Sequence, residues 1–153
     1  MRKIIFAALF ALSLAGCAST GQFGNFIPAT ANQQQIASDA VQQLAKLYPP
    51  AKTRFELQQA TPDDFGIALI NSLRERGYAL LEFNPVNLTQ TSIATAPAQL
   101  DATESMPLRY VLDQAGHKGL YRLTLLVGSQ SITRPYQEEN GSFVPAGYWV
   151  RKE

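Results

Sequence analysis

A single cysteine, Cys17, follows a hydrophobic stretch at the start of this 153-residue chain. Arg2 and Lys3 precede the stretch, and residues 4–14 are apolar apart from Ser13. A charged segment followed by a short apolar segment is typical of a secretory signal peptide. A membrane-spanning helix needs about 20 apolar residues, so this stretch is too short to be one. The folded domain is therefore expected to form from the residues that follow.

The residues just before the cysteine indicate what its thiol does. Residues 14–17 read Leu-Ala-Gly-Cys, which resembles the lipobox of bacterial lipoproteins. In such proteins the thiol receives a diacylglyceryl group, and the α-amine freed by cleavage takes an N-acyl chain. Two or three chains anchor a protein stably, because each buried methylene contributes about 0.8 kcal/mol. We therefore predict that residues 1–16 are a signal peptide and that Cys17 carries this covalent lipid, with no other cofactor.

Two further observations bear on the role and location of Cys17. A lone cysteine cannot form an internal disulfide, so the chain is not a disulfide scaffold. Ala18 and Ser19 follow the cysteine, and neither is aspartate. In enteric-type bacteria this favours sorting to the outer membrane, so we predict a lipid-anchored outer-membrane protein that faces the periplasm. The alternatives are an ordinary secretory signal with an accidental cysteine, or a short N-terminal helix.

The charge of the mature chain argues against nucleic acid as a partner. Removal of residues 1–16 from the 153 takes away Arg2 and Lys3. The 13 Lys and Arg residues then become 11, against 12 Asp and Glu, so the formal net charge is −1. Affinity for nucleic acids derives largely from neutralised phosphates, so we expect none here. The remaining 137 residues suffice for one domain of ordinary size.

Residues 17–32 are expected to form a flexible, lipidated tether ahead of a domain over residues 33–153. The tether lacks charged residues and contains two glycines and one proline, as linkers often do. It also has apolar side chains that a passive linker does not need: Phe23, Phe26, Ile27 and Pro28. Either this segment folds back on its own domain, or it lies as a peptide in a groove of a partner.

Two segments have helical periodicity. Apolar residues recur at helical spacing over residues 33–48, and two prolines end that helix. A second helix is predicted between Thr61, as N-cap, and Gly77, as the stop. Asp63 and Asp64 would then oppose the positive end of the helix dipole.

Alternating or apolar runs predict the strands. A strand over 52–58 and another over 78–83 flank the second helix, so the two are expected to be parallel. A polar loop is predicted over 84–104. Further strands are predicted over 108–112, 120–127, 131–136 and 143–150, with turns at 114–119 and 138–141. The predicted fold class is α+β: a small two-layer domain with one or two helices packed on a mainly antiparallel sheet of about five strands.

The titratable residues do not form a recognisable catalytic set. His117 lies in a glycine-rich turn without a second cluster of ligand-type residues, which favours a solvated turn residue over a metal ligand. The helix start explains Asp63 and Asp64 without acid–base chemistry. Glu138 and Glu139 belong to a predicted turn. We therefore predict that the protein is not an enzyme and holds no metal.

The chain resembles the TrbH-type conjugal transfer lipoproteins. The resemblance rests on the lipobox, on "TPDDFGIALINSLRERGYALLEF" (61–83) and on the tail "SITRPYQEENGSFVPAGYWVRKE" (131–153). Arg134, Tyr136, the Pro145–Gly147 triplet and Trp149 are the more distinctive part of that tail. This family is encoded with the mating-pair formation genes of P-type conjugative plasmids and related integrative elements.

The resemblance implies a structural role in a conjugative type IV secretion system. The protein would be the small lipoprotein that anchors the core complex to the outer membrane. Its partners would be a periplasmic and a channel-forming core protein, in a large ring-shaped hetero-oligomer. Some such lipoproteins end in a domain similar to the N-terminal domain of secretins. By position, the peptide 21–28 would contact the periplasmic partner.

Aromatic residues of the tail are further candidates for partner contacts. Tyr136, Tyr148 and Trp149 are of the types enriched at interface hot spots, although ordinary packing on a sheet explains any one of them. Two other functions remain open. One is a stand-alone envelope lipoprotein that binds a cell-wall or protein ligand. The other is an envelope hydrolase, for which we find no nucleophile–base pair.

Overall fold

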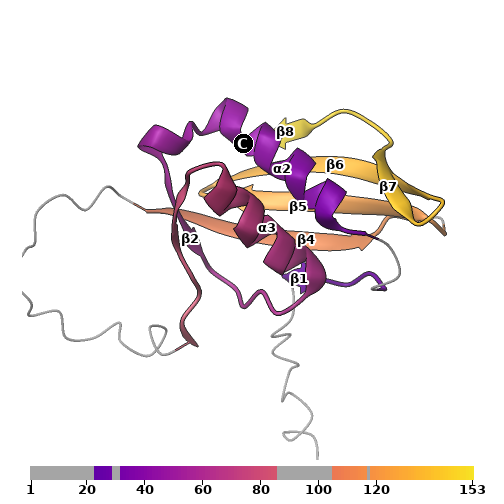
Figure 1. Cartoon of the computed structure of the whole chain (residues 1–153). Helices are drawn as coiled ribbons and strands as arrows, with labels where there is room; N and C mark the ends of the chain where they lie inside the picture. The colour runs from indigo at the N-terminus through magenta and orange to yellow at the C-terminus, as the bar shows by residue number, and fades with distance from the viewer. Residues whose placement is uncertain (1–22, 29–31, 86–104, 117) are drawn as a thin grey trace, which may run out of the picture.

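The computed structural model describes residues 23–28, 32–85, 105–116 and 118–153. Two helices pack on one face of a mixed sheet, which confirms the predicted two-layer α+β class (Figure 1). The helices are α2 (Gln34–Leu47) and α3 (Asp64–Glu75). The strands are β1 (Gly24–Asn25), β2 (Arg54–Leu57), β3 (Ala79–Leu81), β4 (Met106–Gln114), β5 (Leu120–Val127), β6 (Gln130–Glu139), β7 (Ser142–Pro145) and β8 (Val150–Lys152).

The strand order is β3-β2-β4-β5-β6-β7. β2 and β3 are parallel and flank α3 in sequence, as predicted for residues 52–83. β4, β5 and β6 form an antiparallel meander. The short β1 pairs with β4 beyond the end of β2, and β8 pairs with β6 beyond β7. These short edge strands bring the sheet to eight strands among the described residues, against the predicted five.

The predicted single strand over 143–150 is wrong, because β7 ends at Pro145 and β8 begins at Val150. Ala146, the first residue after β7, lies opposite Pro135 of β6, and the Ala146 N–H donates to the Pro135 carbonyl at 2.9 Å. In an antiparallel ladder the N–H of residue 135 would in turn donate to the carbonyl of Ala146. Proline has none, so the ladder is interrupted there and the chain leaves the sheet.

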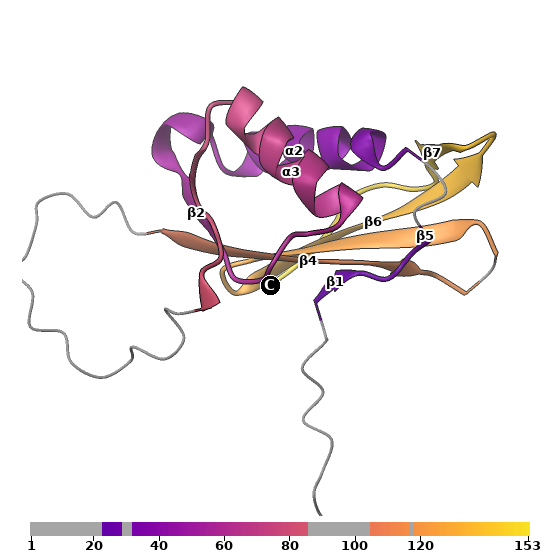
Figure 2. The same ribbon diagram turned by 60° about the horizontal axis from the view of Figure 1, so that its bottom comes forward.

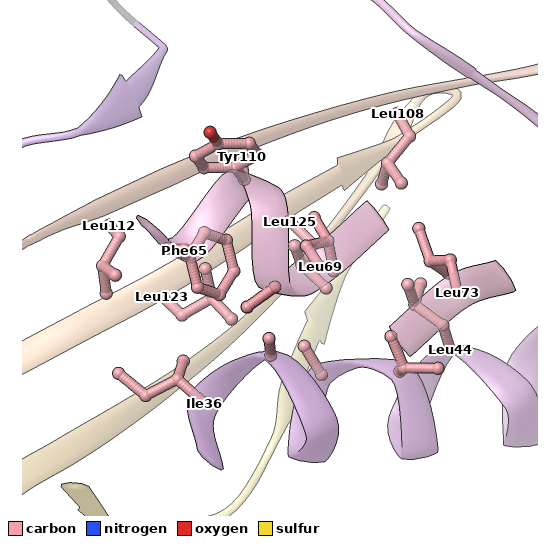
Figure 3. Close-up of a cluster of buried hydrophobic side chains, with 14 of the residues drawn as sticks. Ile36, Leu44, Phe65, Leu69, Leu73, Leu108, Tyr110, Leu112, Leu123 and Leu125 are labelled. Carbon is pink, nitrogen blue, oxygen red and sulfur yellow. The ribbon is translucent and has the colours of Figure 1, made fainter. Parts of the chain in front are cut away.

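The hydrophobic core lies between the two helices and the central strands. α2 contributes Ile36 and Leu44, and α3 contributes Phe65, Leu69 and Leu73 (Figure 3). Alternate residues of β4 and β5 face them: Leu108, Tyr110, Leu112, Leu123 and Leu125. All ten are completely buried, as expected for helices with one apolar stripe over a sheet with one apolar face.

The start of α3 differs from the prediction. Its N-cap is Asp63 and not Thr61: one Asp63 oxygen accepts from the Gly66 N–H at 2.9 Å. The other accepts from the buried Tyr110 hydroxyl at 2.6 Å. The capping residue is thus also bound to β4. Gly77, with φ of 89°, ends the helix as predicted.

The remaining boundaries shift by a few residues. A short 3-10 helix (Pro50–Lys52) occupies the start of the predicted strand 52–58. β4 begins earlier and ends later than the predicted 108–112, and β6 extends to Glu139, into the predicted turn 138–141. The signal peptide, Cys17, His117 and most of the predicted loop 84–104 lie outside the described residues.

Candidate partner-binding site

The candidate contact residues lie at two opposite edges of the sheet. Residues 23–28 belong to β1 and its flanks, beside β4. Tyr136 lies on β6, and Tyr148 and Trp149 lie between β7 and β8, which both pair with β6. Because β5 separates β4 from β6, the structure does not bring the two groups into one site.

The segment 23–28, assigned above to the tether, is seated on its own domain. The Phe26 N–H donates to the Leu112 carbonyl at 2.8 Å, and Ile27 is buried in the core. The Phe23 ring lies 4.9 Å from the Arg109 guanidinium, close enough for a cation–π contact. Phe26 remains 55% exposed, and Pro28 is exposed as well. The segment therefore folds back on its own domain, which was the first of the two alternatives. Phe26 and Pro28 stay exposed and can contact a partner.

Tyr136 is a core residue and not an accessible one. Its side chain is 1% exposed, and its hydroxyl donates to the Asp39 carboxylate of α2 at 2.6 Å. Tyr110 makes the equivalent bond to Asp63 at the start of α3. Each helix is thus fastened to the sheet by a buried tyrosine that donates to an aspartate. Tyr136 therefore has the ordinary packing role that the sequence left open.

Arg134 joins α2 to the segment between β7 and β8. One terminal nitrogen of its guanidinium donates to both Asp39 oxygens, at 2.9 and 2.8 Å, and its Nε donates to the Gly147 carbonyl at 2.8 Å. The guanidinium also lies 5.8 Å from the Trp149 ring. Arg134 and Asp39 are respectively 19% and 25% exposed, so solvent screens this pair only partly.

The Arg134 cluster holds a short loop, residues 146–149, against β6. Gly147 is required there, since a Cβ atom would lie 2.8 Å from Pro135 Cγ. Trp149 is half-buried and packs against the core, whereas Tyr148 is 90% exposed. The next residue, Val150, is also exposed. The Tyr148 ring is therefore presented to solvent on a short loop that is held by Arg134 on one side and continues into β8 on the other.

Asp39 was missed by the sequence reasoning, although Arg134 and Tyr136 stood out in the tail. It is the only acidic residue of α2 and lies next to the apolar stripe. A single acidic residue beside the apolar stripe was the feature of the sequence that could have indicated a buried partner for Asp39. The partner of Asp39 could not be predicted from local patterns, because Arg134 is 95 residues away in sequence.

The two tyrosine–aspartate pairs have an electrostatic consequence. Burial raises the pKa of Tyr136 well above its ordinary value of 10, and the hydrogen bond to Asp39 and the charge of Asp39 raise it further. Burial and Asp63 raise the pKa of Tyr110 in the same way. Both phenols therefore stay protonated in the folded state at pH values where an unfolded chain ionises them.

This difference predicts loss of stability in alkali. Above about pH 10 the unfolded state binds fewer protons than the folded state, so the free energy of unfolding decreases as pH rises, by about 1.4 kcal/mol per pH unit for each such tyrosine. Urea denaturation between pH 8 and 11 measures the slope. We expect a shallower slope for the double variant Tyr110→Phe/Tyr136→Phe, whatever its stability at pH 8. An unchanged slope would contradict the assignment.

Neither a metal centre nor a spanning helix is found in the described part of the chain. No group of three His, Cys, Asp or Glu side chains there is placed to hold a metal ion. None of its helices is long and apolar enough to cross a membrane. Asp63 caps α3 and Glu138 accepts from the Tyr121 hydroxyl at 3.0 Å, so both have structural partners.

Comparison with known proteins identifies the family. The model of the conjugal transfer protein TrbH matches residues 19–153, which include the whole described domain. The model of the prokaryotic membrane lipoprotein lipid attachment site matches residues 1–18, which include Cys17. No curated protein and no solved structure matches the chain. The chain carries a lipoprotein attachment site and belongs to the TrbH family of conjugal transfer proteins.

Proposed function

We propose that this protein is a structural subunit of a conjugative type IV secretion complex and anchors its core to the outer membrane. The observation that carries the proposal is the order of the two family matches. A lipid attachment site at residues 1–18 is followed directly by a conjugal transfer domain over the rest of the chain. Such a chain links a membrane to an assembly. Covalent lipid on Cys17 supplies the membrane end.

The protein end of this link uses the exposed aromatic residues of the domain. Tyr148 and Phe26 are the exposed aromatic side chains of the described residues. The Phe26 N–H donates to the Leu112 carbonyl, and the carbonyl of Gly147, just before Tyr148, accepts from Arg134. Aromatic anchors contribute much of the energy of many interfaces. Anchors on a fixed backbone lose less conformational entropy on binding than mobile ones.

The two anchors lie at opposite edges of the sheet, which suits a subunit with two neighbours. Phe26 lies beside β4, and Tyr148 lies beyond β6. A ring built from repeated units uses two different surfaces of each unit. Phe26 and Pro28 would contact one core protein, and Tyr148 would contact the next protein around the ring.

Photo-crosslinking tests these contacts directly. A photoreactive phenylalanine analogue at position 148 or 26 is expected to crosslink the lipoprotein to core proteins of the secretion complex in intact cells. The control position is Gln42, which is exposed on α2. Crosslinks of equal yield from all three positions would reflect crowding and contradict specific contacts. Crosslinks only to proteins unrelated to secretion would favour a stand-alone binding lipoprotein.

A further inference from the structure

The face of the sheet opposite the helices is not covered by any helix of the described residues. Both helices lie on the same side of the sheet (Figure 2). Side chains of β4, β5, β6 and β8 alternate, so those that do not enter the core form a second surface. We call this surface the open face. One cross-strand row of it consists of Val111, Thr124, Thr133 and Val150.

The open face carries positive charge and no negative charge in two neighbouring cross-strand rows. Its central row has no charge, and Thr133 donates to Thr124 across the strands at 3.2 Å. The neighbouring row begins with Arg109, passes through Leu126 and ends with Lys152. These two rows contain two cations and no acidic residue. The row on the other side of the central one holds Asp113 and Arg122, which form an ion pair without net charge.

The start of the described chain lies on this same face. The Phe23 ring contacts Arg109, whose neighbours Leu108 and Tyr110 both point into the core. Arg109 therefore points away from the helices, and the chain reaches the domain from the open side. Phe23 is six residues after Cys17. Six residues span at most about 20 Å when fully extended.

This short connection restricts how the domain can face the membrane that holds Cys17. The helical layer adds at least about 10 Å behind the sheet, since an α-helix with side chains has that diameter. To turn the helices toward the membrane, the connection would have to pass around the sheet and this layer, which uses nearly its whole reach. With the open face toward the membrane, no extension is needed.

We propose that the open face lies against the phospholipid headgroups of the membrane to which Cys17 is anchored. Arg109 and Lys152 interact with anionic headgroups, and the threonine and valine row lies at the interface. The attraction of each cation is modest, but the lipid anchor makes the contact intramolecular and so raises its effective concentration. The proposal rests on the lipid anchor and not on assembly with secretion proteins.

The test uses the lipidated full chain, reconstituted alone into vesicles of phosphatidylethanolamine and phosphatidylglycerol. Because Cys17 is acylated, a cysteine introduced elsewhere is the only free thiol. One fluorophore is attached through Ser131→Cys, which lies on the open face between Leu126 and Lys152. The matched one is attached through Gln42→Cys on α2. Lipids with a nitroxide at headgroup level quench fluorophores that lie close to the membrane surface.

We expect strong quenching at position 131 and weak quenching at position 42. The double variant Arg109→Gln/Lys152→Gln should weaken the face-on state by about fivefold per cation, and quenching at position 131 should fall accordingly. The control Lys46→Gln/Arg76→Gln removes the same charge from the helical layer and should change nothing. Unfolding midpoints verify that every variant is folded.

Three outcomes would overturn the proposal. Stronger quenching at position 42 would mean that the helices face the membrane. Equal quenching at both positions would mean that the domain has no preferred face. Protection of position 131 from a water-soluble quencher in detergent micelles, together with a dimeric mass, would mean that a second copy covers the open face. Because no secretion protein is present, none of these results bears on the proposed assembly role.

Discussion

Cys17→Ser is expected to abolish membrane anchoring completely. The serine hydroxyl is not a substrate for diacylglyceryl transfer, so both the diacylglyceryl group and the N-acyl chain are lost together. Each acyl chain contributes about 0.8 kcal/mol per buried methylene, so no weaker contact of the domain can replace two or three chains. The measurement is incorporation of labelled palmitate, together with fractionation of cells into membranes and soluble periplasm.

The signal peptide must be replaced in this experiment, because an uncleaved apolar stretch would itself hold the Cys17→Ser variant in the membrane. Residues 1–16 are therefore replaced by an ordinary cleavable signal in the Cys17→Ser chain. This protein should appear in the soluble periplasm and carry no palmitate. Ser19→Ala, a change two residues away, should remain acylated and in the membranes. Palmitate on the Cys17→Ser chain would show that another residue is modified.

Asp39→Ala is expected to lower the free energy of unfolding by about 3 kcal/mol, the lower end of the range for breaking a buried ion pair. The substitution leaves the Arg134 guanidinium, only 19% exposed, without its counter-ion. It also removes the acceptor of the buried Tyr136 hydroxyl. Both losses act on the contact that fastens α2 to β6. Chemical denaturation followed by circular dichroism measures the change.

A more exposed arginine–aspartate pair serves as the control. Arg122 and Asp113 lie on neighbouring strands, and the Arg122 side chain is 49% exposed. Asp113→Ala should therefore cost less than about 1 kcal/mol, as solvent-exposed pairs do. Asp39→Asn, which keeps an acceptor for Tyr136, should fall between the two alanine variants. Equal losses from Asp39→Ala and Asp113→Ala would contradict the role assigned to the Arg134 cluster.

The sequence predicted the elements whose signals are local. The second helix has an apolar stripe, acidic residues at its start and a glycine at its end, and α3 lies where these signals place it. The parallel pairing of β2 with β3 follows from a helix between two strands. The lipid site at Cys17 has its entire signal within 17 residues, and the family match supports it.

Features that depend on distant residues could not be read from local patterns. The bond that ties the N-cap Asp63 to the sheet comes from Tyr110, which is 47 residues away. The break between β7 and β8 depends on Pro135 of the opposite strand, and the two-residue strand β1 has no periodicity at all. For the same reason Tyr136 and Tyr148 looked equivalent in the tail, yet one is buried and the other is exposed.

The size of the protein in its native membrane tests the central claim most directly. Outer membranes of cells that carry the native gene cluster are solubilised gently, and the lipoprotein is followed by size-exclusion chromatography and mass spectrometry. Our account predicts a megadalton-scale particle that also contains the core proteins of the secretion complex. A free lipoprotein, together with a core complex that remains intact without it, would contradict the proposed structural role.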